Sequence, residues 1–391
     1  MHELSQMIKD DMKPALGVTE PGAIAFAVAK ARSFTKGDIK KVNVAMNSGM
    51  YKNAFTCGIP NSNEVGNVFA AALGVVAGNA DKGLESLADV TPEDNVKAQE
   101  MIDQGKITVE LSGITSRIFI EATVETEEDK AIVTIRDSHT NITKIIVNDK
   151  VELETEDEKK TEEDGGEEES HSIHKYTLQQ LYDYVTTVDI EEIRFINEAY
   201  KVNLELFHEG LENPRTTFAR QLLAINNGKE VSDDEQKTAS LMCNAAIEAR
   251  VIGLDKPAMS ITGSGAHGII ATMPLYAAYK VNGYTEEQLL RATALSYLVC
   301  MYIKEYSGRL SAFCGCAIAA GSGMACALVY LRGGTVEMMA HTLNNMASSI
   351  TGMICDGGNQ GCTMKGVAAV DAAYKSVEFA MNGIYISEVH G

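Results

Sequence analysis

Residues 107–147 read ITVELSGITSRIFIEATVETEEDKAIVTIRDSHTNITKIIV, and apolar and polar residues alternate along most of this segment. Four runs in it are rich in β-branched residues and are joined by glycine or charged turns: 107–111, 117–125, 130–137 and 142–147. Alternation with a period of two is typical of strands that bury one face. The segment therefore predicts a β-sheet, and an antiparallel sheet is the simplest arrangement of consecutive strands.

The sequence that follows is acidic and then helical. Glu152 to Ser170 reads ELETEDEKKTEEDGGEEES, which is too polar and too strongly self-repelling to bury anything. From Tyr176 onward the period is helical, with glycine-rich interruptions. We therefore expect an N-terminal α+β portion over residues 1–151, an acidic linker or loop over 152–172, and a helical domain over 173–391.

The segment upstream of the sheet predicts helices around an interruption. Pro14, Gly17 and Pro21 bracket a turn, and residues 23–32 form a strong helix-forming run. Thr19 and Glu20 therefore lie at a helix start, where free backbone N–H groups can hold a carboxylate. A strand is expected at 41–47, a glycine-, asparagine- and proline-rich loop at 48–63, and a helix at 65–79.

Length and charge narrow the range of functions. A chain of 391 residues is longer than one typical hydrophobic core supports. Its 34 lysines and arginines stand against 54 aspartates and glutamates, a net charge of −20 that disfavours nucleic acid as a partner. Residues 1–14 contain no apolar leader, which predicts a cytoplasmic protein. The uncharged residues 310–331 are rich in Gly, Ala and Ser, so we expect a buried helix and no membrane span.

The distribution of cysteines is uneven. Six of the eight lie in roughly the last quarter of the chain, among them Cys314-Gly-Cys316 and the pair Cys355 and Cys362. Thiolates separated by small residues can wrap an iron–sulfur cluster. Alternatively, buried cysteines act as small apolar residues in tightly packed helices, which is the expectation for Cys300 and Cys326. Spacing alone leaves both readings open.

Several motifs, in order along nearly the whole chain, resemble a known family. They are GVTEPGA at 17–23, GIP at 58–60, TGSGAHG at 262–268, SGR at 307–309 before CGC at 314–316, and CDG at 355–357 through Cys362. Together they resemble the L-cysteine desulfidase family, which is related to the iron–sulfur L-serine dehydratases. The resemblance implies a 4Fe-4S cluster on three cysteines, with the fourth iron open to substrate. The implied ligands are Cys355, Cys362 and Cys314, with Cys316 as the alternative to Cys314.

The resemblance also implies a reaction. The protein is expected to be a lyase of amino-acid catabolism that takes L-cysteine to pyruvate, ammonia and sulfide, with L-serine as the next substrate. The helical part is then the cluster-binding domain of an α+β protein. The side chains expected to bind the substrate are Thr19, Glu20, Ser264 and Arg309. Gly- and Ala-rich helices are compatible with a homo-oligomer.

One position departs from the family pattern. The residue before Thr-Glu-Pro is the catalytic base, a cysteine, in the desulfidases, whereas this chain has Val18, which cannot accept a proton. His267 and Cys57 are the expected replacements, because an imidazole suits proton transfer near pH 7 and Cys57 lies in a Gly- and Pro-rich loop. The alternative is a non-catalytic relative that binds an amino acid or carries the cluster as a sensor. No role is expected for His139.

Overall fold

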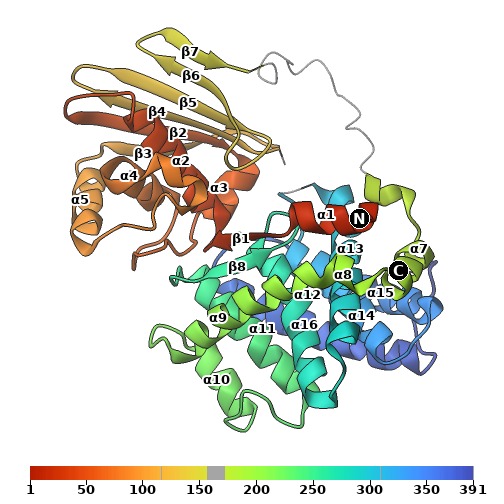
Figure 1. Ribbon diagram of the computed structural model, residues 1–391. Coiled ribbons are helices and arrows are strands. Elements are labelled where there is room, and N and C mark those ends of the chain that lie inside the picture. The colour runs from red at the N-terminus through yellow and green to blue at the C-terminus, as the bar shows by residue number, and fades with distance from the viewer. Residues whose placement is uncertain (116, 156–171, 309, 391) are drawn as a thin grey trace.

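The computed structural model describes residues 1–115, 117–155, 172–308 and 310–390. Figure 1 shows a sheet with helices on one of its faces, next to a larger helical body. The fold is therefore α+β, as the sequence predicts. The acidic residues 156–171 and Arg309 lie outside the described residues.

The sheet has six strands in the order β3-β2-β4-β5-β6-β7. Their bounds are β2 Ile39–Asn47, β3 Ile107–Gly113, β4 Phe119–Thr126, β5 Lys130–Arg136, β6 Ile142–Val147 and β7 Lys150–Glu154. The last strand enters the segment that the sequence assigned to the acidic linker. Its five residues are all exposed, and three of them, Lys150, Glu152 and Glu154, are charged.

The predicted antiparallel sheet is wrong at one pair of strands. β2 lies between β3 and β4, and it runs parallel to β3 while every other pair is antiparallel. A parallel pair needs a crossover that returns the chain to the same end of the sheet. That crossover comprises α3 Ser48–Ala54, α4 Asn67–Ala77, a 3-10 turn at Ala80–Glu85 and α5 Pro92–Asp103. The first of these, α3, replaces part of the expected loop at 48–63.

Helix α2 (Thr19–Arg32) lies at the centre of the half of the protein that contains the six-stranded sheet. Nearly every residue from Thr19 to Ala31 is buried, because the helix packs between the sheet and α4. A helix that is apolar all round belongs in the interior of a protein. The first turn of α2 is thereby fixed relative to the sheet.

The helical half is built around three long buried helices, α11 (Glu235–Val251), α12 (Gly265–Asn282) and α13 (Glu286–Ser307). The others pack around them: α7 Leu178–Thr187, α8 Ile190–Ile193, α9 Asn197–Glu212, α10 Phe218–Ile225, α14 Gly321–Leu331, α15 Val336–Ile350 and α16 Gly361–Met381. Residues 310–331 include a π-helical turn, Cys316–Ala320, before α14. Within the described residues no helix combines the length and the apolar character needed to span a bilayer.

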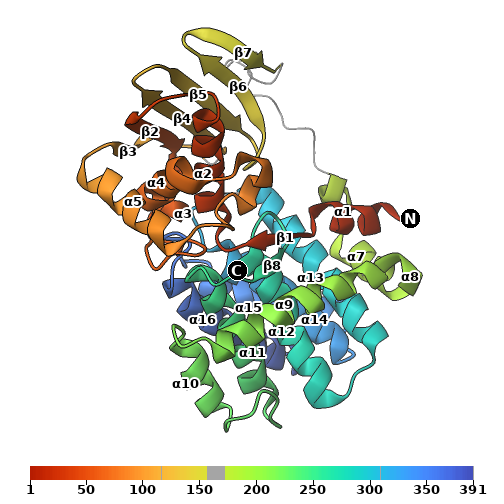
Figure 2. The same ribbon diagram turned by 60° about the vertical axis from the view of Figure 1, so that its left-hand side comes forward.

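The N-terminal residues tie the two halves together. α1 (Glu3–Asp11) packs on α13, and β1 (Lys13–Leu16) pairs antiparallel with β8 (Pro257–Ser260), as Figure 2 shows. β1 directly precedes α2, and β8 directly precedes α12. Pairing of these short strands therefore brings the starts of both helices together. The division at residues 151 and 172 remains a prediction.

Candidate active site

A small cavity of about 80 Å³ lies where the starts of α2 and α12 meet. Val18, Thr19 and Glu20 line it from one half of the protein, and Ser264 and His267 line it from the other half. The remaining wall contains all of the cysteines named by the sequence motifs: Cys314, Cys316, Cys355 and Cys362. Residues more than 300 positions apart in the sequence thus line the same cavity.

Backbone hydrogen bonds hold the two cysteine segments side by side. The amide of Cys314 donates to Met353 O at 2.8 Å, and the amide of Cys355 donates to Ala312 O at 2.9 Å. Cys362 lies at the start of α16, where its thiol donates to Gly357 O at 3.3 Å. The chain between Cys355 and Cys362 therefore forms a loop over the cavity, here called the ligand loop (residues 355–362).

The thiols differ in their readiness to ionise. A hydrogen bond from the Cys316 thiol and the nearby Lys365 ammonium lower the pKa of Cys314 to about 6. The same hydrogen bond raises the pKa of Cys316 well above its ordinary value. Burial raises the pKa of Cys362 to about 11. Of the C-G-C pair, Cys314 is therefore the one that carries the thiolate.

The described residues contain no group of three or more His, Cys, Asp or Glu side chains arranged to share one metal ion. A cubane cluster makes a different demand, because each thiolate binds a different corner and the ligands must stand apart. Thiolates are also the ligands that iron and sulfide prefer. The chemistry of the donor set along this cavity wall therefore fits an iron–sulfur cluster.

His267 reaches the cysteines through a gap at Gly315. A Cβ built on Gly315 would lie 2.8 Å from His267 Nε2, so only glycine fits between Cys314 and Cys316. The other ring nitrogen, Nδ1, lies 2.5 Å from Thr262 Oγ1. Burial, together with the charges of Lys304 and Arg250, lowers the pKa of His267 well below its ordinary value. The ring is therefore neutral at pH 7.

Glu20 is a buried carboxylate at the start of α2. It accepts hydrogen bonds from Asn53 Nδ2 at 2.7 Å and Thr19 Oγ1 at 3.2 Å, and His139 Nε2 lies 3.9 Å away. Burial alone would raise the pKa of Glu20, but His139 and Asn53 outweigh it and hold the pKa at about 2. Glu20 is therefore ionised at neutral pH.

Two of the predicted site residues are not brought to the cavity by the described structure. Cys57 is fully buried away from it, where its thiol donates to Ala54 O at 3.3 Å and burial raises its pKa. Arg309 lies outside the described residues. Ser264 is the N-cap of α12, but its side chain makes no capping hydrogen bond.

Several polar residues that the sequence did not assign to the site also line the cavity, among them Asn53, His139, Arg250 and Lys304. Lys304 is buried, donates to Ser311 Oγ at 3.1 Å, and has a pKa lowered chiefly by burial. His139, for which no role was expected, sits in the turn between β5 and β6 beside Glu20. One signal in the sequence could have indicated Arg250: it is a charged residue within a stretch of small and apolar residues in α11.

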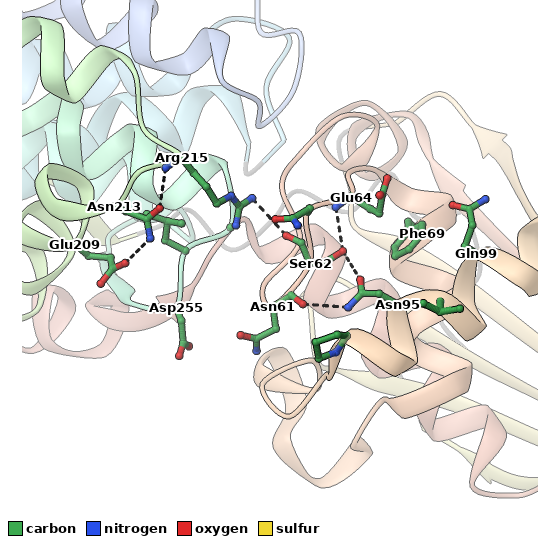
Figure 3. A pocket seen from close by; sticks show the side chains of 15 residues that line it. Asn61, Ser62, Glu64, Phe69, Asn95, Gln99, Glu209, Asn213, Arg215 and Asp255 are labelled. Carbon is green, nitrogen blue, oxygen red and sulfur yellow. Dashed lines mark hydrogen bonds between the residues drawn. The ribbon is translucent and has the colours of Figure 1, made fainter.

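A second and larger cavity, of about 540 Å³, lies elsewhere between the two halves. Figure 3 shows Arg215 reaching across it to the backbone of Ser62, and Arg215 also donates to Ile252 O at 2.9 Å. Asparagine, glutamine and acidic side chains dominate its lining, and cysteine and histidine do not contribute. Within the described residues its lining offers no thiol and no imidazole, whereas the smaller cavity has both, so the smaller cavity is the candidate site.

Comparisons with known proteins show what this chain is similar to. Residues 81–391 match the family described as serine dehydratase alpha chain. A UPF0597 protein of Clostridium botulinum (strain Hall) is 40% identical over 382 residues, covering 97% of this chain and 88% of the relative. A UPF0597 protein of Caldanaerobacter subterraneus subsp. tengcongensis is 36% identical over 388 residues, covering 99% of this chain and 90% of the relative. A UPF0597 protein of Bacteroides fragilis is 34% identical over 391 residues, covering 100% of this chain and 90% of the relative. These matches support the serine dehydratase part of the resemblance, and none of their names specifies cysteine desulfidase.

Proposed function

Because the chain belongs to the serine dehydratase alpha chain family, we propose that it is a 4Fe-4S-dependent lyase that carries out β-elimination on a small amino acid. L-cysteine is the first expected substrate and L-serine the second. The observation that carries the proposal is the shared cavity: Cys314, Cys355 and Cys362 line the same enclosure as Glu20 and His267.

Cys314, Cys355 and Cys362 would hold the cluster. The low pKa of Cys314 favours it over Cys316, because a thiolate is the form that binds iron. When bound, the cluster supplies an open iron that acts as a Lewis acid on the leaving thiol or hydroxyl. Lys365 lies on the same wall and offsets the negative charge of the thiolates.

The protein's own groups perform the proton transfer. His267 is neutral and can therefore accept the Cα proton of the substrate. The electron pair left on Cα forms a double bond to Cβ as the Cβ–S or Cβ–O bond breaks, and the thiol or hydroxyl departs. The resulting enamine takes up one water and yields pyruvate and ammonia. Glu20, anionic at neutral pH, holds the substrate ammonium, with Thr19 beside it.

The deciding experiment measures iron, acid-labile sulfide and turnover after strictly anaerobic purification and reconstitution. We expect about four iron and four sulfide per chain, and equal amounts of pyruvate and sulfide from L-cysteine. Protein that holds neither iron nor sulfide and releases no pyruvate would contradict the lyase function.

Val18 favours a second function, that of a non-catalytic relative that binds an amino acid or senses through the cluster. Its side chain lies at the cavity against the ligand loop, where a Cβ on Gly358 would be 2.8 Å from Val18 Cγ1. We expect Val18→Cys to change turnover by less than about tenfold if His267 is the base, with Val18→Thr as the matched control for shape. If the wild type is inactive and Val18→Cys, but not Val18→Thr, gains a large turnover, the result would instead favour the non-catalytic relative.

A further inference from the structure

Arg250 is a buried cation at the cavity that the proposed reaction has not yet used. It lies near the C-terminal end of α11, is only 4% exposed, and lines the cavity with His267 and the cysteines. Its Nε has no hydrogen-bond partner within the described residues. Removing a charged group from water without a partner is costly, so a buried guanidinium facing a cavity calls for an anion there.

The start of α12 adds to the attraction for an anion. An ideal Cβ on Gly265, the first residue of α12, would lie 2.6 Å from Arg250 Nε, so the guanidinium rests against this helix end. The N-cap side chain of Ser264 leaves the first backbone N–H groups of this 18-residue helix without a capping bond. Free N–H groups and the helix dipole both favour a negative group at this point.

Glu20 supplies the opposite charge in the same cavity. The Glu20 carboxylate, the Arg250 guanidinium and the His267 ring all line this one cavity of about 80 Å³. His267 therefore lies within reach of both charges. A ligand that satisfies them has a cationic group and an anionic group close together, as a free α-amino acid does.

We propose that Arg250 and the first turn of α12 form the subsite for the α-carboxylate of the ligand, so that the cavity selects free amino acids and rejects their amides. This inference rests on the proposed lyase function, which supplies the amino acid. Planar guanidinium groups bind carboxylates through paired hydrogen bonds, so replacement by lysine preserves the charge but not the geometry.

The test compares L-alanine with L-alaninamide, because neither has a leaving group on Cβ and neither is consumed. Calorimetry on anaerobically reconstituted protein should give L-alanine at least about tenfold tighter binding than the amide. In Arg250→Gln the preference should fall to near unity, and Arg250→Lys should lie between. The control Arg215→Gln, in the other cavity, should leave the preference unchanged.

Each outcome decides the question. A wild-type protein that binds L-alanine no better than the amide, or that binds neither, overturns the inference even if Arg250→Gln fails to fold. If Arg250→Gln folds and keeps the preference while the wild type releases pyruvate, the subsite is wrong and the lyase function stands. If Arg250 sets the preference in a protein without iron, the lyase function is wrong and the subsite stands.

Discussion

Asn53 Nδ2 donates a 2.7 Å hydrogen bond to Glu20 Oε1, and the backbone oxygen of Asn53 accepts the amide of Gly358 at 3.1 Å. One residue of α3 thus connects the buried carboxylate of α2 to the ligand loop. The groups proposed to bind the substrate and the cluster are therefore positioned by a single short helix, and we expect a substitution on one side to affect the other.

Cys355→Ala should abolish both the cluster and turnover, because it removes one thiolate from the proposed set of three. Iron and sulfide content, with pyruvate release, measures both effects. Cys326→Ala is the matched control, since Cys326 is fully buried in α14 and does not line the cavity. A Cys355→Ala protein with a full cluster and normal activity would remove the basis of the assignment.

His267→Gln should lower kcat by about 10²–10⁴-fold while iron and sulfide content stay unchanged, because a general base contributes on that scale and the cysteines remain. The paired readout separates catalysis from structure. Loss of the cluster in this variant would mean that His267 supports the Cys314–Cys316 segment and is not the proton acceptor.

Gly315→Ala should impair the site sterically. The new methyl group would lie 2.8 Å from His267 Nε2, and such overpacking costs about 1–3 kcal/mol. We expect a lower midpoint in urea unfolding together with reduced turnover. Gly352→Ala is the control, because a Cβ there meets no atom within 4 Å. Equal behaviour of the two variants would show that the His267 ring does not occupy this gap in solution.

Glu20 should make stability depend on acidity. Its pKa is held at about 2 in the folded protein, below the ordinary 4.5 of an unfolded chain. The ionised carboxylate therefore stabilises the fold above about pH 4.5, and this contribution is lost as the pH falls towards 2. The difference in unfolding free energy between wild type and Glu20→Gln should shrink over that window by on the order of 3 kcal/mol.

Urea unfolding at a series of pH values measures this difference. The exposed Glu205, replaced by glutamine in the same way, provides the comparison and should show little dependence on pH. A difference between wild type and Glu20→Gln that stays constant from pH 7 downward would mean that Glu20 is not held ionised by its neighbours.

The sequence predicts the elements of this fold better than their order in space. The strands at 107–147 follow from alternation alone, but β2 enters between β3 and β4, and that depends on a long crossover that no local pattern encodes. β7 was missed because all five residues of Lys150–Glu154 are exposed on an edge strand and three of them are charged, so they read as part of the acidic segment that follows.

The same limit applies to the site. The motifs named Glu20, Ser264, His267 and the cysteines, which the structure brings to one cavity. They did not name Arg250 or His139, because these residues come from a buried helix and from the turn between β5 and β6, and only the packing of the chain brings the two together. Cys57 was named because its loop is rich in glycine and proline, and yet its side chain packs in the core.

The pairing of Lys13 with Ser260 also bears on the order in which the parts of the cavity are synthesised. The hydroxyl of Ser260 bonds to the backbone of Lys13 across 247 residues of chain, so the first wall of the cavity emerges from the ribosome long before its partners exist. About 340 residues separate Glu20 from Cys362, which takes on the order of 20–70 s to translate. If Cys362 is a cluster ligand, as proposed, iron and sulfide can be loaded only at the very end of synthesis, and any chain cut short before Cys362 lacks one of the three proposed ligands.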